Sequence, residues 1–188
     1  MKKILIVCGS SQTSELLTNL IESHDNYSIK AVSETQEADN LIKNTDSDII
    51  IICSPLPEKA LIELAINASE KTTAGVMIIC SAEDYEKISE KAERFGIYIM
   101  TKPVNKAVFC SSLRILGLTG ARMHNVVTEY NRLENKIEEA RLINRAKCIL
   151  IQYLKLTEPQ AHRYIEKQAM DKRLSKLEVA KSILTTYE

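Results

Sequence analysis

Five short apolar runs alternate with amphipathic segments along the first 116 residues, and this alternation limits the possible folds more than any other feature. The third run contains four consecutive isoleucines, which is typical of a strand buried on both faces. Between the runs, apolar residues recur with helical spacing. The pattern predicts an α/β fold with a doubly wound, five-stranded parallel sheet. The predicted strands are Lys3–Cys8, Tyr27–Val32, Asp48–Cys53, Gly75–Cys80 and Ile97–Met100. The predicted helices are Ser14–Ser23, Thr35–Asn44, Lys59–Ser69, Tyr85–Phe95 and Lys106–Leu116.

This order of elements resembles the receiver domain of response regulators, a flavodoxin-like fold. The resemblance implies a site beyond the carboxyl ends of the strands. Receivers place acidic residues there after strand one, a phospho-acceptor Asp at the end of strand three, Ser or Thr after strand four and Lys after strand five. This chain has two of these groups, Ser81 and Lys102, but Cys53 stands at the acceptor position. Cys8 and Gly9 replace the acidic pair.

The missing carboxylates change the expected chemistry of this site. Phosphoryl transfer to a receiver needs a carboxylate nucleophile and Mg²⁺ held by oxygen ligands, and a thiol is a poor ligand for a hard cation. We therefore predict a degenerate receiver that does not use aspartyl phosphorylation. A regulatory protein partner, a small ligand and concentration-driven dimerisation are all open as inputs. Ser81 and Lys102 are expected to make local hydrogen bonds.

Three cysteines, Cys8, Cys53 and Cys80, fall at the carboxyl ends of strands that should be neighbours in this sheet. One hypothesis is that the three thiols converge into a redox or soft-metal sensor, with Lys102 lowering a thiol pKa. The alternative is that Cys fills small buried spaces, as free Cys often does. The sequence has no CxxC pair and no zinc spacing. We expect no metal and no cofactor.

Apolar residues in the middle of the chain recur at alternating steps of three and four residues. This heptad spacing predicts a coiled-coil dimerisation helix, and a polar residue at an a position can fix the register of a parallel dimer. The alternative is that this helix packs back on its own receiver. Gly117 and Gly120 weaken the helix after the receiver and mark a candidate hinge. The heptad positions are Met123, Val126, Tyr130, Leu133, Ile137, Ala140 and Asn144.

Two capping boxes divide the C-terminal stretch into three helices. Thr157 with Gln160, and Ser175 with Glu178, have the spacing at which an N-cap hydroxyl and an N3 side chain exchange hydrogen bonds with the backbone. The boxes predict a helix ending near Leu154, followed by helices Glu158–Lys172 and Lys176–Tyr187.

Charge is distributed unevenly along this neutral chain. Residues 144–182 hold nine basic and four acidic side chains, a net charge of +5, whereas the whole chain has no net charge. A local excess of positive charge suggests a polyanionic partner. Arg and Lys are also common on solvated helix faces, so charge alone does not identify the partner.

The same stretch resembles the ANTAR domain, a three-helix RNA-binding module of transcription antitermination regulators. Cys148 departs from the family pattern, where Gly is usual, and Ile151 departs where Met is usual. The resemblance implies that RNA is the partner and that Lys147, Arg163, Lys167 and Arg173 contact it. Tyr153 and Tyr164 could stack on RNA bases, but both lie on apolar faces and are predicted to be core residues. The matching residues are Ala146-Lys147-x-Ile149-Leu150, Thr157-Glu158-x-x-Ala161, Ala169-Met170, Arg173-Leu174 and Val179-Ala180.

We therefore expect a receiver-like domain over residues 1–117, a coiled-coil dimerisation helix over 118–143 and an ANTAR-like domain over 144–188. By resemblance, the homodimer binds paired hairpins in nascent mRNA and prevents a terminator from forming. The alternatives are a protein-interaction adaptor that never binds RNA, and a thiol- or metal-sensing regulator. No nucleophile–base arrangement is apparent, so we do not expect an enzyme. No apolar run approaches the ~20 residues of a membrane helix, and we expect a cytoplasmic protein.

Overall fold

The computed structural model of the chain describes residues 1–22, 27–44 and 46–187. Ser23, the predicted end of the first helix, lies outside these ranges. The chain divides into two compact units, Met1–Val127 and Thr128–Glu188. Helix α5 (Lys106–Leu154) contributes residues to both. Each unit is described separately below.

The first unit is built on a five-stranded, entirely parallel sheet with the order β2-β1-β3-β4-β5. This arrangement confirms the predicted flavodoxin-like fold. The sequence order reverses direction at β1, so the loops after β1 and β3 leave the sheet toward opposite faces and a site can form between them. The strands are β1 (Lys2–Cys8), β2 (Tyr27–Val32), β3 (Ile49–Cys53), β4 (Gly75–Cys80) and β5 (Tyr98–Thr101).

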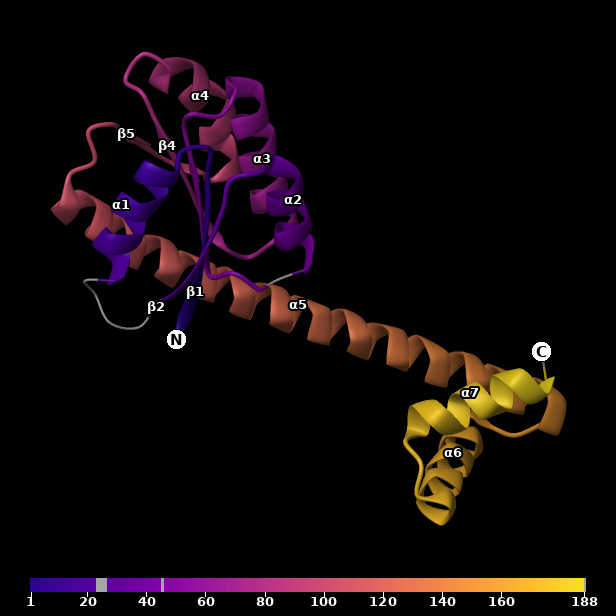
Figure 1. Cartoon of the computed structure of the whole chain (residues 1–188). Helices are drawn as coiled ribbons and strands as arrows, with labels where there is room; N and C mark the ends of the chain where they lie inside the picture. The colour runs from indigo at the N-terminus through magenta and orange to yellow at the C-terminus, as the bar shows by residue number, and fades with distance from the viewer. Residues whose placement is uncertain (23–26, 45, 188) are drawn as a thin grey trace. The chain divides into compact units, whose positions relative to one another are not determined.

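Helices cover both faces of this sheet (Figure 1). Three helices lie on one face, and α1 and the first turns of α5 lie on the other. The segment predicted as one helix over residues 85–95 ends earlier, because its last three residues form a 3-10 turn and Gly96 then adopts a left-handed φ of 71°. The helices are α1 (Ser11–Glu22), α2 (Thr35–Asn44), α3 (Glu58–Lys71) and α4 (Tyr85–Ala92), followed by η1 (Glu93–Phe95).

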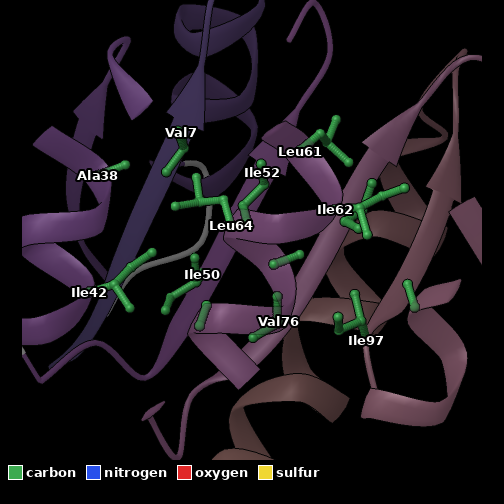
Figure 2. Close-up of a cluster of buried hydrophobic side chains, with 14 of the residues drawn as sticks. Val7, Ala38, Ile42, Ile50, Ile52, Leu61, Ile62, Leu64, Val76 and Ile97 are labelled. Atoms are coloured by element: carbon green, nitrogen blue, oxygen red, sulfur yellow. The ribbon is translucent and has the colours of Figure 1, made fainter. Parts of the chain in front are cut away.

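Alternating side chains of the central strands fill two separate cores. Ile50 and Ile52 of β3 pack with α2 and α3, and Figure 2 shows this cluster. Ile49 and Ile51 pack in the second cluster, with α1 and with Phe109 of α5. Because successive residues of a strand point to opposite faces, all five residues of β3 are buried.

Helix α5 is continuous through Gly117 and Gly120, so the predicted helix end at Leu116 is wrong. A Cβ at Gly120 would lie 3.0 Å from the Thr73 carbonyl oxygen, and one at Gly75 would lie 2.6 Å from the Leu116 carbonyl oxygen. The small residues let α5 approach the start of β4 closely, which explains Gly120 without a hinge. No helix in the described ranges is both long and apolar enough to span a membrane.

The second unit holds the end of α5 together with α6 (Glu158–Lys172) and α7 (Lys176–Tyr187), as predicted. Both capping boxes are present. Thr157 N donates to Gln160 Oε1 at 2.8 Å, and Ser175 N donates to Glu178 Oε2 at 2.7 Å. The three helices share one small core of buried residues: Ala146, Ile149, Leu150, Ala161, Ile165, Ala169, Val179, Ala180, Ile183 and Leu184.

Candidate functional sites

Two of the predicted site cysteines face each other at the carboxyl edge of the receiver sheet. Cys8 is the last residue of β1 and Cys53 is the last residue of β3, and the two are register partners on neighbouring strands. Both belong to the core cluster on the α1 and α5 face, with 2% and 0% of their surfaces exposed. The thiols therefore occupy the place where a receiver would carry carboxylates.

Cys80 does not join this pair, so the predicted convergence of three thiols is wrong. The register pairs Cys53 with Ile79, which puts Cys80 one residue further along β4. A shift of one residue turns a side chain to the other face of a sheet, and Cys80 packs in the opposite core. Among the described residues, no group of three or more His, Cys, Asp or Glu side chains is placed to hold a metal ion.

Two other receiver-site residues, Lys102 and Ser81, make local hydrogen bonds. Lys102 Nζ donates to the Ser54 carbonyl oxygen at 2.7 Å, which links the ends of β5 and β3. Ser81 Oγ donates to Asp84 Oδ2 at 2.6 Å at the start of α4. Gly9 lies so close to the next loop that a Cβ there would be 2.4 Å from the Pro55 carbonyl oxygen. The loops after β1 and β3 therefore touch at this edge.

The two facing thiols have different acidities. A hydrogen bond from the Cys53 thiol lowers the pKa of Cys8 from 9.0 to about 6, against the opposing effect of burial. The Ser10 backbone N–H and the charge of Lys102 lower it further. Donating that hydrogen bond, together with burial, raises the pKa of Cys53. This arrangement favours the thiolate on Cys8 over a thiolate on Cys53.

Two lysines of the C-terminal unit are held in ion pairs. Lys147 Nζ lies 2.8 Å from Glu158 Oε1, and only 16% of the Lys147 side chain is exposed. Lys176 Nζ lies 2.7 Å from Glu166 Oε1, which His162 Nε2 also approaches at 3.3 Å. Lys147 was predicted to contact RNA, but here it joins the end of α5 to the start of α6.

One face of α6 is exposed and carries both basic and apolar side chains. Arg163 and Lys167 are one turn apart and both are exposed. Met170, which follows on the same face, is 79% exposed, and Leu174 is 41% exposed. Arg173 ends the helix in a left-handed conformation with φ 53°. Sequence analysis named Met170 and Leu174 only as residues that match the ANTAR pattern.

The prediction that Tyr153 and Tyr164 are core residues is wrong, because they are 56% and 39% exposed. The buried core of this unit consists of Ala, Val, Ile and Leu residues. The ring of Tyr153 instead lies on the ring of Tyr187, with the centroids 5.5 Å apart.

The large heptad residues of α5 are exposed along the helix. Ala140 and Asn144 are exposed as well. Such a series of apolar side chains on one helix is unusual in solvent and is a feature of interaction surfaces. The exposed fractions are 54% for Met123, 57% for Val126, 64% for Tyr130, 51% for Leu133 and 56% for Ile137.

Comparisons with known proteins agree with this geometry. The ANTAR domain family matches residues 131–184, which cover the second half of α5, α6 and α7. The fold of the first unit is that of solved receiver domains. One, a CheY-like response regulator receiver domain from Methanospirillum hungatei JF-1, is 17% identical with a TM-score of 0.56, over 65% of this chain and 98% of that one. Residues 131–184 are thus an ANTAR domain, and the first unit has the receiver fold.

Relatives of this regulator extend the comparison. The transcriptional regulatory protein PdtaR of Mycobacterium tuberculosis, in strains CDC 1551 / Oshkosh and H37Rv, is 20% identical over 98% of this chain and 90% of the relative. A two-component response regulator from Clostridium difficile is 20% identical with a TM-score of 0.55, over 62% of this chain and 95% of that one. The ANTAR domain and the similarity to PdtaR support a regulator of transcription.

Proposed function

We propose that this regulator binds RNA through the exposed face of α6 and acts as a transcription antiterminator. The observation that carries the proposal is the exposed Arg163 and Lys167 pair within an ANTAR domain. Neither side chain has a salt bridge among the described residues, whereas Lys147 and Lys176 each have a carboxylate partner. Arg163 and Lys167 are therefore two adjacent exposed cations that are available to phosphates.

Apolar side chains beside these cations fit RNA better than a simple polyanion. Single-stranded RNA loops are recognised by stacking on exposed bases together with phosphate contacts. Tyr164 and Met170 adjoin the basic pair on α6 and are exposed. We assign phosphate contacts to Arg163 and Lys167, with Arg173 at the helix end, and base contacts to Tyr164 and Met170. Lys147 has a positioning role through Glu158.

We further propose that two copies pair in parallel through the heptad residues of α5. The occupant of this stripe is a second copy because heptad spacing matches the stripe to itself, and Asn144 supplies a polar a residue that fixes the register. Two linked ANTAR domains on two adjacent hairpins gain from effective concentration. Holding both hairpins would keep an overlapping terminator stem from forming.

The receiver lacks a carboxylate at its acceptor position, so we propose that its input is not aspartyl phosphorylation. Cys53 lies at the end of β3, and Lys102 Nζ donates a hydrogen bond to the Ser54 carbonyl oxygen. A regulatory protein partner acting on this unit is compatible with both features. RNA binding by the untreated protein is then expected without a phosphodonor.

The test measures binding of the full chain to an RNA with two adjacent short hairpins, and to the same RNA with one hairpin deleted. We expect Arg163→Ala/Lys167→Ala to weaken binding at least about tenfold and to reduce the slope of log K against log salt by about 1–2. The matched control, Lys59→Ala/Lys87→Ala, removes two exposed cations from the receiver unit and should leave both quantities unchanged.

Two outcomes contradict the proposal. If both double variants lost the same amount of RNA affinity, binding would depend only on net charge, and the α6 face would not be the RNA-binding site. No binding by the full chain, together with salt-insensitive capture of a protein partner, would favour the adaptor alternative. The dimer is tested separately: Leu133→Asp/Ile137→Asp should give a monomer by light scattering and abolish the preference for two hairpins over one.

A further inference from the structure

We propose that Cys8 and Cys53 form a redox couple, which a hydroperoxide converts from two thiols to a disulfide. This site lies at the carboxyl edge of the receiver sheet and does not depend on the proposed RNA binding. It takes the position of the absent carboxylates and gives the receiver a covalent modification of its own. The argument rests first on the placement of the two residues and then on the groups around them.

Placement permits the bond without rearranging the strands. The two residues are direct register partners on β1 and β3. Neighbouring strands lie about 4.7–4.9 Å apart, and disulfides join Cα atoms about 4.4–6.8 Å apart. Both side chains belong to the same face of the sheet, since they pack in one core cluster. Cys80 is equally buried but packs on the other face, so it cannot compete for either thiol.

The surroundings assign different roles to the two thiols. Cys53 donates a hydrogen bond to Cys8, and the Ser10 backbone N–H and the Thr13 hydroxyl also lower the pKa of Cys8. Lys102, fixed on the Ser54 carbonyl oxygen, adds positive charge nearby. Cys8 is therefore the nucleophile, since the thiolate is the reactive form. Cys53, whose pKa is raised, is the resolving thiol.

The reaction balances in two steps. The Cys8 thiolate attacks one oxygen of the hydroperoxide, breaks the O–O bond and becomes a sulfenic acid, while the leaving oxygen takes a proton and departs as water or alcohol. The Cys53 sulfur then attacks the Cys8 sulfur and displaces the hydroxyl, which leaves as water with the Cys53 proton. Two thiols lose two electrons and two protons, and the peroxide is reduced. A dithiol reductant reverses the bond by exchange.

The experiment uses the full chain with Cys110→Ser and Cys148→Ser, which removes the two less buried thiols. Hydrogen peroxide is added in equal amount, and free thiols are alkylated in denaturant. We expect a protein about 2 Da lighter that takes up one alkyl group, on Cys80, instead of three. Trypsin should release residues 4–30 linked to residues 44–59. Unchanged alkylation, or a link that contains Cys80, overturns the proposal.

A second measurement tests the assignment of the nucleophile. In Cys53→Ser, Cys8 should stop at the sulfenic acid and be trapped by dimedone, whereas Cys8→Ser should leave Cys53 unreacted. In the protein that keeps both Cys8 and Cys53, the rate at which hydrogen peroxide oxidises Cys8 should be constant above pH 7. It should fall as the pH drops through about 6, because the thiolate is lost there. A midpoint near 9 overturns the assignment. Cys80→Ser is the matched control and should form the disulfide at the unchanged rate.

Discussion

The two compact units of this regulator bury their apolar side chains in different ways. In the receiver unit, β3 and β4 are buried at every position, and branched side chains fill two thick cores on either side of the sheet. In the C-terminal unit, each helix buries only a narrow stripe, and four of the ten buried residues are Ala. The stability of the first unit comes mainly from close packing of its buried side chains. In the second unit, helix caps and ion pairs contribute a larger share.

The same difference separates the two candidate sites. The facing cysteines at the sheet edge are almost completely enclosed, so their chemistry is set by a few neighbours within the fold. The α6 face has no such enclosure, and its charges are available to a large partner. The comparison indicates that substitutions in the receiver core act through stability, and that substitutions on α6 act through binding.

The largest expected effect comes from removing one core isoleucine from each unit. Ile51→Ala should lower the free energy of unfolding of the receiver unit by about 4 kcal/mol, through lost burial and the cavity left behind. Ile165→Ala removes a similar volume from a much smaller core, where a loss of about 3 kcal/mol is a large share of the total stability. Hydrogen exchange resolved by peptide should show α6 and α7 exchanging faster in Ile165→Ala while the sheet stays protected, and the sheet exchanging faster in Ile51→Ala while α6 and α7 stay protected.

The opposite result would break the comparison. If Ile165→Ala destabilised the sheet as much as the helices, the two units would unfold as one. If Ile51→Ala raised exchange in α6 and α7 as much as in the sheet, the same conclusion would follow. The conservative variants Ile51→Val and Ile165→Val are the controls, with expected losses of about 1 kcal/mol each.

A second prediction concerns the close contact between α5 and β4. Gly75→Ala should cost about 3 kcal/mol, because its Cβ would lie 2.6 Å from the Leu116 carbonyl oxygen, and a backbone atom cannot move aside easily. Gly117→Ala is the matched control. Its Cβ would meet only the flexible end of Lys2, and Ala favours a helix over Gly by about 1 kcal/mol. The thermal unfolding temperature should therefore fall in Gly75→Ala and rise or stay the same in Gly117→Ala.

Local signals predicted much of the fold. The bounds of α2, α6, α7 and β4 agree with the sequence analysis, because buried apolar runs and capping boxes are encoded by adjacent residues. The continuity of α5 was missed, since the role of Gly120 depends on backbone atoms at Thr73 and Asp48 that lie far away in sequence. The exposure of Tyr153 was also missed, since its ring contacts Tyr187, which lies on another helix.

The sites were predicted less completely than the fold. Position alone placed Cys8 and Cys53 at strand ends, but a one-residue offset in the β3–β4 register decided that Cys80 faces away. Nothing local revealed that Lys147 would pair with Glu158, eleven residues along the chain and on the next helix. The RNA contacts, the heptad dimer and the three-part domain boundaries stay predictions.

A smaller effect is expected at the helix caps, where the C-terminal unit differs most from the receiver. Thr157→Ala removes both the N-cap hydroxyl and its bond to Gln160, and should cost about 1 kcal/mol. Thr157→Ser keeps the hydroxyl and should be nearly neutral. Exchange rates at the first turn of α6 measure the difference. Equal rates in the two variants would show that this cap does not stabilise the helix.

The smallest expected effect is a loss of stability of the C-terminal unit at acidic pH. The pKa values of Glu158, Glu166 and Glu178 lie below the ordinary 4.5, chiefly through hydrogen bonds from Lys147, from Lys176 and from the Ser175 backbone N–H. A lowered folded-state pKa adds stability that is present above pH 4.5 and is lost as the pH falls through the folded value. The helicity of α6 and α7 should therefore become more sensitive to heat below pH 4.5.

Salt distinguishes the origins of this acid dependence. The stability contributions of Glu158 and Glu166 come from ion pairs with solvent-accessible carboxylates, and they should shrink at about 1 M salt, where screening is strong. The part from Glu178 comes from a capping box and should persist, because a hydrogen bond to the backbone does not need a cationic partner. Glu178→Gln keeps an oxygen acceptor, so the cap should survive and lose its response to pH. If Glu178→Gln in high salt were as acid-sensitive as the parent protein, the dependence would have to come from the receiver unit, and the contrast between the two units would fail.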